Sequence, residues 1–171
     1  MLTRNKIESL FRMLNEKCKK RKITGEIGIV GGAVMCLVYR TRPSTKDIDR
    51  IFAPTQKIRE LVAEISAEEG LPSDWLNDGA KGYLGENFKR IEVLNLSNLR
   101  VWAPQPEYML AMKCISARFD TNDSDDVIFL IKHLGLKSVE QVLAVAELYY
   151  PKKRIPIKTS FFIEELIEKI G

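Results

Sequence analysis

The sequence predicts a mixed α/β protein, with a small mixed sheet flanked by helices in its first part and helices alone in its second part. Three observations predict this class. Short β-branched runs such as Gly25–Val30 are confined to the residues before 104. Apolar residues recur at helical spacing in the opening residues and throughout the stretch after Pro104. The 171 residues, 45% of them hydrophobic, suffice for a globular core. We therefore expect an α/β core over residues 1–103 and a helical part, residues 104–171, packed on it.

Periodicity and the positions of glycine and proline place the elements of the first part. Apolar residues at helical spacing predict an opening helix, namely Ile7, Leu10, Phe11 and Leu14. After it we expect a strand over Gly25–Val30, a turn at Gly31-Gly32, a helix over Ala33–Tyr39 and a loop over Arg40–Lys46. A second strand is expected over Asp47–Phe52, followed by a helix over Thr55–Glu69 that ends at Gly70 and by a loop over Pro72–Gly85. The first part ends with a hairpin of strands Lys89–Leu96 and Leu99–Ala103.

The second part is predicted to be entirely helical. Its helices are expected from Pro106 to Arg118, over Val127–Leu134 with Gly135 as the stop, from Ser138 to Tyr150, and over Phe161–Ile170. Ser138 followed by Gln141 is a capping-box pattern, which favours a helix start at this point.

Charge and cysteine content exclude several classes of function. The net charge of +4 permits a polyanionic partner but is lower than that of a dedicated nucleic-acid binder. The three cysteines are far apart in sequence, so we expect neither a disulfide framework nor a cysteine metal site, and a reducing cytoplasm is the expected compartment. No apolar stretch is long enough to cross a membrane, so we expect no membrane partner.

The pair Gly31-Gly32 lies between a predicted strand and a predicted helix. Glycines in such a turn let the backbone approach a ligand closely, and the N–H groups at the start of the helix favour a phosphate. A purely structural turn is the alternative for this pair.

Asp47 and Asp49 are separated by one residue in a predicted strand, so their carboxylates are expected on the same face. Two carboxylates so close repel each other unless they are protonated, solvated or bridged by a cation. Mg²⁺ held by two carboxylates and by substrate phosphates is the usual form of such a bridge. A solvated acidic patch at the edge of the sheet is the alternative.

Together the two features resemble the nucleotidyltransferase superfamily, whose members share a DNA polymerase beta-like fold with a Gly-Gly or Gly-Ser turn and paired aspartates. Between the two features lies a loop that carries Arg42, Thr45 and Lys46, and the whole string reads GGAVMCLVYRTRPSTKDID. The resemblance implies a phosphate cradle at Gly31-Gly32 facing a metal site at Asp47 and Asp49, with the three loop residues contributing to nucleotide binding.

The second part resembles the branch of this superfamily that contains AbiEii-type toxins of toxin–antitoxin systems, through the stretches PEYMLAMKCISAR and NDSDDVIFLIKHLG. In that branch a lysine ends one helix and an acidic motif opens the next. Lys113 and either Asp126 or Asp123 stand at the matching positions. The apolar neighbours of Lys113 also suggest that it either reaches water or meets an anion. Acids in a first helical turn are, however, favoured by the helix dipole alone.

The superfamily usually adds a third carboxylate on a later strand. Glu92 is the only acid within the predicted strand Lys89–Leu96, and it is either that metal ligand or a solvent-facing strand residue. Asp74 and Asp78, in the preceding loop, are weaker candidates.

The resemblance implies a Mg²⁺- or Mn²⁺-dependent transfer of a nucleoside monophosphate from an NTP to an acceptor hydroxyl. Asp47 and Asp49 would bind the metal, Lys113 would neutralise the leaving pyrophosphate, and Asp126 would orient Lys113 or the acceptor. The acceptor would be an RNA such as the tRNA acceptor end, a protein hydroxyl or a small molecule, and a toxin would have an antitoxin protein as partner. A nucleotide-binding or interaction module that has lost turnover is the alternative.

Overall fold

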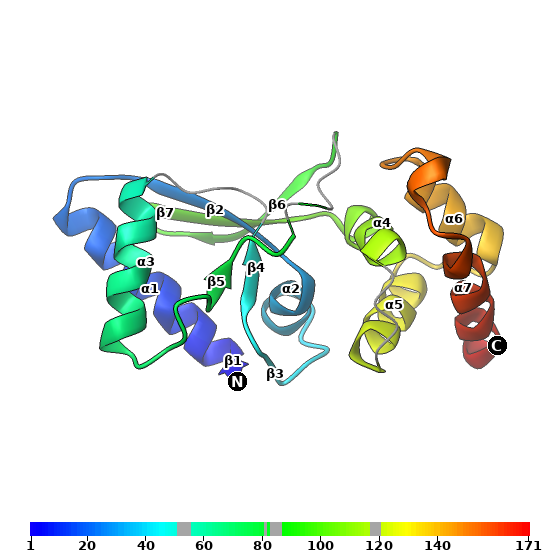
Figure 1. Cartoon of the computed structure of the whole chain (residues 1–171), viewed down its shortest axis with the longest axis horizontal. Helices are drawn as coiled ribbons and strands as arrows, with labels where there is room; N and C mark the ends of the chain where they lie inside the picture. Colours follow the sequence, from blue (N-terminus) through cyan, green and yellow to red (C-terminus); the bar gives the residue numbers. More distant parts are fainter. Residues whose placement is uncertain (51–55, 81, 83–86, 117–120) are drawn as a thin grey trace. The chain divides into compact units, whose positions relative to one another are not determined.

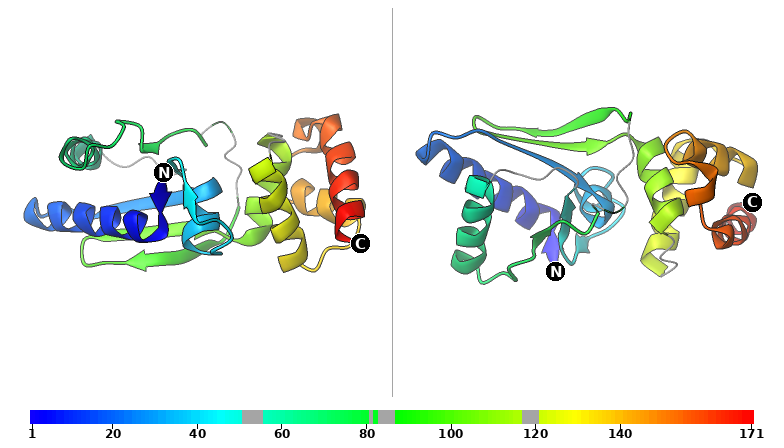
Figure 2. Two further views of the ribbon diagram at one scale, coloured as in Figure 1. Left: turned by 90° about the horizontal axis from the view of Figure 1, so that it is seen from below. Right: turned by 45° about the horizontal axis from the view of Figure 1, so that its top comes forward.

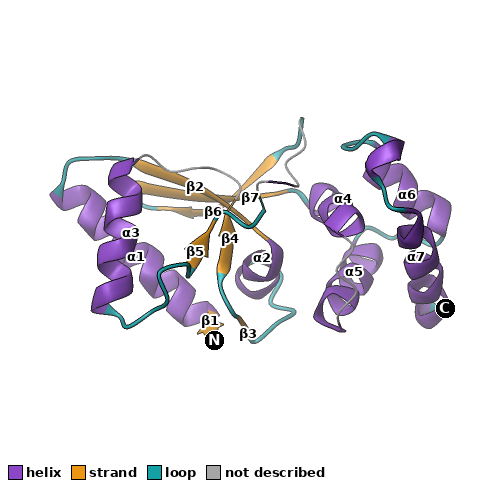
Figure 3. Cartoon of the chain, in the orientation of Figure 1, coloured by secondary structure: helices purple, strands orange, loops and turns teal. Residues whose placement is uncertain are grey.

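A computed structural model describes residues 1–50, 56–80, 82, 87–116 and 121–171. The chain divides into two compact units. The first unit comprises Met1–Gly82 and Arg90–Ala103, and the second comprises Tyr83–Lys89 and Pro104–Gly171. Strands belong to the first unit, whereas the described elements from Pro106 onward are helices (Figure 3). The predicted mixed α/β class is therefore confirmed.

A five-stranded mixed sheet forms the centre of the first unit (Figure 1). Its strands, in spatial order, are β5 (Leu76–Asn77), β4 (Ile48–Arg50), β2 (Gly25–Val30), β7 (Leu99–Pro104) and β6 (Arg90–Asn95). β2 runs parallel to β7 and antiparallel to β4, and β4 runs parallel to β5. A second, two-stranded antiparallel sheet pairs β1 (Leu2–Thr3) with β3 (Ser44–Thr45).

Three helices cover this sheet: α1 (Arg4–Lys20), α2 (Gly31–Leu37) and α3 (Gln56–Glu68). The helices α1 and α3 pack against each other, and Figure 2 shows both beside the strands. The apolar face predicted for the opening helix is fully buried, as is that of α3, whose buried residues include Ile58, Leu61 and Ile65. Burial of these faces is the main source of stability for such amphipathic helices.

The hairpin of β6 and β7 is tied to α1 by a buried asparagine. The backbone N–H of Asn98 donates to Oδ1 of Asn15 (2.8 Å), and the backbone N–H of Gly25 donates to the carbonyl of Asn98 (2.9 Å). Leu96 N–H donates to the carbonyl of Leu99 across the turn (2.9 Å). The hairpin predicted around Ser97-Asn98 is confirmed, and Asn15 places it beside the start of β2.

The second unit is a helical bundle of α4 (Pro106–Ser116), α5 (Thr121–His133), α6 (Val139–Glu147) and α7 (Ile157–Ile170). α4 packs against α5 and α6, and α7 packs against α5 and α6. The segment before β6 also belongs to this unit, because Lys89 and Gln105 exchange hydrogen bonds and the Phe88 ring lies 4.2 Å from that of Tyr108. The capping box is present, with Gln141 N–H donating to Oγ of Ser138 (3.3 Å).

Several predicted boundaries are wrong in the structure. The helix predicted over Ala33–Tyr39 ends at Leu37, the loop predicted over Arg40–Lys46 contains β3, the helix predicted to reach Tyr150 ends at Glu147, and the helix predicted over Phe161–Ile170 begins at Ile157. α2 begins at Gly31 itself, directly after β2, so the glycines open the helix instead of forming a separate turn. The expected loop over Pro72–Gly85 contains the short strand β5. α5 begins at Thr121, six residues before the predicted start at Val127. The end of the predicted strand Asp47–Phe52 and the start of the predicted helix Thr55–Glu69 fall in residues 51–55, which lie outside the described residues.

The three cysteines are free and buried. Burial raises the pKa of each thiol, and that of Cys114 rises to about 12. Because the thiolate is the reactive species, we expect no thiol of the native protein to react rapidly with a disulfide reagent at pH 8, whereas all three react after unfolding. Titration with such a reagent, with and without denaturant, checks this result. If one thiol per molecule of native protein reacted rapidly with the reagent, a helix that carries a cysteine would have to open readily.

None of the helices in the described part of the chain is long and apolar enough to cross a membrane.

Candidate functional site

The carboxylate of Asp49 lies against the start of α2. β2 and β4 are paired so that Val30 stands opposite Asp49, which places this carboxylate beside the residue that follows Val30. Gly31 has φ +64°, and a Cβ atom at this position would lie 3.2 Å from Oδ2 of Asp49. A side chain at residue 31 would therefore be strained and would crowd the carboxylate. The structure thus brings the glycine pair and Asp49, the second aspartate of the predicted site, together.

Two residues of the loop after α2 approach the second glycine. A Cβ atom at Gly32 would lie 2.7 Å from Oγ1 of Thr45 and 3.3 Å from Nη1 of Arg42. Thr45 is buried in β3, and Arg42 is half-buried. Lys46, the third loop residue singled out from the sequence, is exposed. The backbone of Gly32 is therefore closely surrounded by one hydroxyl group and one guanidinium group.

Asp47 directly precedes β4, in which only Ile48–Arg50 are described. Ile48 is buried, whereas Asp47 and Asp49 are both half-buried. This alternation agrees with the side-chain period of a strand and keeps both carboxylates within reach of solvent.

On its other side Asp49 faces β5, which sequence reasoning missed. β4 and β5 are paired so that Asp49 stands opposite Asn77. A Cβ atom at Gly79 would lie 2.7 Å from Oδ1 of Asp49 and 2.7 Å from Oδ1 of Asn77. The carboxylate therefore lies between two glycines, with an amide oxygen beside it. The signal in the sequence is the string Asn77-Asp78-Gly79, which favours a turn.

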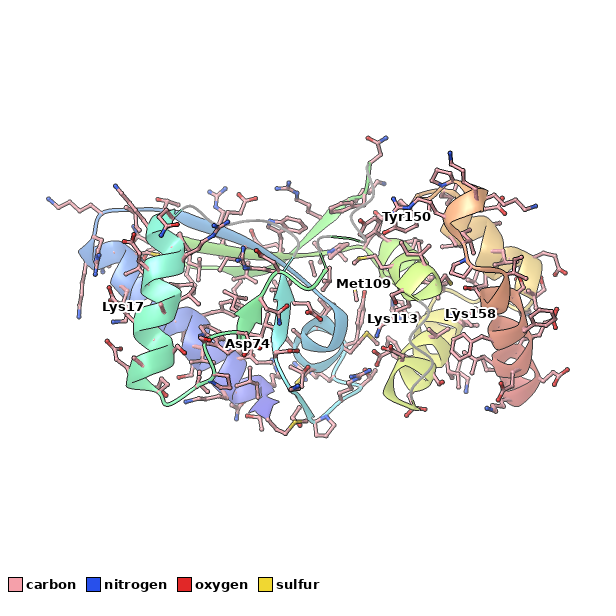
Figure 4. All side chains as sticks on the ribbon, in the orientation of Figure 1. Lys17, Asp74, Met109, Lys113, Tyr150 and Lys158 are labelled. Atoms are coloured by element: carbon pink, nitrogen blue, oxygen red, sulfur yellow. The ribbon has the colours of Figure 1, made fainter. Side chains whose placement is uncertain are left out.

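Next to Asp49 and Asn77 along the chain, Arg50 and Asp78 form an ion pair. Their Nη2 and Oδ1 atoms are 2.6 Å apart, and the Arg50 side chain is 8% exposed. Burial lowers the pKa of Arg50 and outweighs the opposing effect of Asp78. This ion pair links β4 to the residue after β5, and Asp78, a candidate for the third carboxylate, lies here. Asp74 is exposed in the loop before β5 (Figure 4).

Glu92, the predicted third carboxylate, is not brought to Asp49. It lies on β6, and β2 and β7 separate this strand from β4, so the two positions are about 14 Å apart across the sheet. Instead Glu92 lines a groove of about 330 Å³. The other residues of that groove are Arg4, Glu8, Leu37, Val38, Val93 and Leu94. β7, the strand beside β2, carries no acidic residue either.

Lys113 and the acidic motif meet within the second unit. Nζ of Lys113, labelled in Figure 4, lies 2.9 Å from Oδ2 of Asp126 and forms a second ion pair with Asp123. The side chains of Lys113 and Asp126 are 12% and 1% exposed. α4 supplies the cation, and both carboxylates come from the beginning of α5. Asp125 is exposed, and the ring of His133 stacks on Phe129.

The site of the first unit has the donors that a hard cation prefers. Carboxylate and amide oxygens are the usual ligands of Mg²⁺ and Mn²⁺, and the glycines at 31 and 79 allow the Asp49 carboxylate to lie close to the backbone. Within the part of the chain that the structure describes, no three His, Cys, Asp or Glu side chains are close enough together to hold a metal ion. Any third protein ligand among these residues must therefore come from another residue type.

Comparison with known proteins gives one match, which is to a family model. The chain has no significant match among curated proteins or among solved structures. A family model described as a nucleotidyltransferase of unknown function (DUF6036) matches residues 5–159. This match includes the glycine pair, both aspartates and the Lys113 cluster. The chain therefore belongs to the DUF6036 nucleotidyltransferase family.

Proposed function

We propose that the chain transfers a nucleoside monophosphate from an NTP to an acceptor hydroxyl and releases pyrophosphate, with Asp47 and Asp49 as the metal-binding pair. The family supports nucleotidyl transfer in general. The observation that carries the specific proposal is the position of the Asp49 carboxylate beside Gly31, because it places a cation-binding group next to the glycine pair.

The residues around the glycine pair would bind the nucleotide. Backbone N–H groups at Gly31 and Gly32 would donate to phosphate oxygens. The guanidinium of Arg42 and the hydroxyl of Thr45, both next to Gly32, would add a charge and a donor. Lys46 would contribute only as an exposed charge.

A bound Mg²⁺ or Mn²⁺ would stabilise negative charge on the phosphate oxygens and favour the attacking hydroxylate. Asp47 and Asp49 would hold this ion through carboxylate oxygens. Their mutual repulsion in the absence of a cation makes the pair suited to this role. Most of the catalytic effect would come from positioning and electrostatics, as in other phosphoryl-transfer enzymes.

For Lys113 we propose the role that the sequence predicts, which is to neutralise charge on the leaving pyrophosphate. Its ion pairs with Asp123 and Asp126 hold the ammonium group in place within the second unit. Asp126 would then act as a positioning residue for Lys113.

The acceptor and the biological role are finer proposals. The resemblance of residues 106–135 to AbiEii-type toxins favours an RNA acceptor such as the tRNA end, and an antitoxin protein as partner. A protein hydroxyl is the other acceptor that the same reaction could use.

A specific observation favours a second candidate, a nucleotide-binding module without turnover. Glu92 lies on a distant strand and β7 carries no acid, so the usual third carboxylate has no equivalent on these strands. Such a module would bind NTP with Mg²⁺ but would form no product.

The two candidates are separated by one transfer assay. The purified protein is incubated with each α-labelled NTP, total RNA and Mg²⁺, with EDTA in a parallel reaction. We expect label to appear on RNA or on protein from one preferred NTP, and to be absent with EDTA. Absence of label, together with a rise in melting temperature on adding Mg²⁺ and NTP, would support the binding module instead. Absence of both effects would overturn both candidates.

A further inference from the structure

The first turns of α7 carry two large apolar side chains on the surface of the second unit. Ile157 and Phe161 are 83% and 67% exposed. They are four residues apart in one helix, so they lie on the same face. The side of α7 that packs on the bundle is formed by other residues, namely Thr159, Ile163 and Leu166. A single exposed apolar residue is ordinary on a protein surface, but two that adjoin on one helix form a candidate contact surface.

The charge on this face changes sign along the helix. Three exposed basic residues, Lys152–Arg154, precede α7, and exposed Lys158 lies in its first turn. Beyond Phe161 the exposed charges are mostly acidic, with Glu164, Glu165 and Glu168. A helix dipole favours acids in the first turn and bases in the last. The order of these charges is therefore unfavourable within α7 itself and calls for another explanation.

A second α7 that runs antiparallel explains this order. It places its acidic end beside the basic beginning of the first helix, and its reversed dipole favours the charges that the first dipole disfavours. An anionic membrane, an RNA or an acidic protein would be attracted to the beginning of the face and repelled by its end. A second copy of the chain is complementary to both ends at once, as in the two-fold interfaces that are commonest among homodimers.

We propose that the exposed face of α7 is a two-fold interface with a second copy of this chain, in which the two helices are antiparallel and the two-fold axis passes by Phe161. The two Phe161 rings would meet, with Ile157 of each copy beside them. The apolar pair would thus be withdrawn from water at the centre of the contact, and the charged residues would lie around it.

The helix geometry also specifies a charge pair across this interface. Lys158, labelled in Figure 4, and Glu165 lie on the same side of Phe161, about 60° and about 40° around the helix. The two-fold axis reverses the helix but keeps this side, so Lys158 of each copy would face Glu165 of the other. Glu165 also pairs with Lys169 on its own helix (2.7 Å), but both side chains are more than half exposed, so this bond competes weakly.

Sedimentation equilibrium of the full chain measures this association. The contact is small, so we expect a transient dimer with a dissociation constant on the order of 100 µM. Phe161→Ser should remain monomeric and, because residue 161 is exposed, should melt at the wild-type temperature in dilute solution. A wild type that is monomeric at about 1 mM, or a Phe161→Ser variant that dimerises equally, overturns the inference. A monomeric wild type that instead binds phosphatidylserine vesicles through Phe161 would assign the face to a membrane and overturn it too.

Charge reversal tests the antiparallel arrangement. Lys158→Glu and Glu165→Lys should each weaken the dimer about tenfold or more, because like charges then meet twice. An equal mixture of the two variants should form a heterodimer as tight as the wild type, because both pairs are again of opposite charge. Lys132→Glu makes the same change on exposed α5 and should dimerise like the wild type. A mixture that associates no better than the separate variants rules out the proposed arrangement.

Discussion

Replacing Lys113 with methionine is expected to lower the free energy of unfolding by about 3–5 kcal/mol. The ammonium group is the partner of two carboxylates, and one of them, Asp126, is 1% exposed. Methionine fills a similar volume but removes the cation that pairs with both carboxylates, and the Asp126 carboxylate has almost no access to water. A buried charge that loses its partner cannot recover its hydration, and this penalty accounts for the predicted loss.

Chemical denaturation of the wild type and the variant measures this difference. Lys132→Met is the matched control, since Lys132 is exposed on α5 and its replacement should change stability by less than about 0.5 kcal/mol. The triple variant Lys113→Met/Asp123→Asn/Asp126→Asn also removes the charges of the two carboxylates, so it should regain part of the lost free energy of unfolding. Equal effects at Lys113 and Lys132 would show that water screens the pair and that it does not hold α4 to α5.

The change Asp49→Asn is expected to reduce nucleotidyl transfer about a thousandfold, the effect of removing a strong electrostatic contact from a transition state. The substitution keeps the shape of the side chain, so the contacts with Gly31 and Gly79 can persist. An amide oxygen carries no formal charge and binds a divalent cation more weakly than a carboxylate. The loss should therefore appear both in binding of the cation with NTP and in the transfer rate, with the fold intact.

Single-turnover transfer rates and thermal melts of the same samples check this prediction. Glu60→Gln makes the same chemical change on the exposed face of α3 and should leave the rate unchanged. The rise in melting temperature caused by Mg²⁺ and NTP should disappear in Asp49→Asn alone. An Asp49→Asn protein that transfers label at the wild-type rate would place the reaction elsewhere in the molecule.

Much of the fold was predictable because its signals are local. The apolar stripe of α1, the β-branched residues of β2 and the stop at Gly70, which has φ +61°, each depend on a few adjacent residues. The pairing of the Gly31-Gly32 region with Asp49 was also predictable, although only through the resemblance to a known superfamily. The boundaries that failed lie where polar or glycine-rich residues begin a helix, as at Thr121 and Gly31.

The rest required the order of the strands, which short sequence patterns do not encode. Glu92 was a reasonable third ligand until β6 was found at the far edge of the sheet. Asn77 was overlooked because β5 has only two residues and lies among Pro, Asp and Gly residues, which favour turns. Its position beside Asp49 arises from pairing with β4 across a stretch that includes the whole of α3.

The pairing of β2 with β7 also determines when the first unit can fold. Gly25 pairs with Leu99, and the residues between them contain most of that unit and a short piece of the other. Contacts between residues so distant in sequence form slowly, because closing the long loop costs entropy before the paired strands stabilise the chain. During synthesis the edge of β2 that pairs with β7 therefore stays unpaired until β7 has left the ribosome. A nascent chain that stalls before residue 99 would expose this buried, β-branched edge, which makes such fragments prone to aggregation and to capture by chaperones.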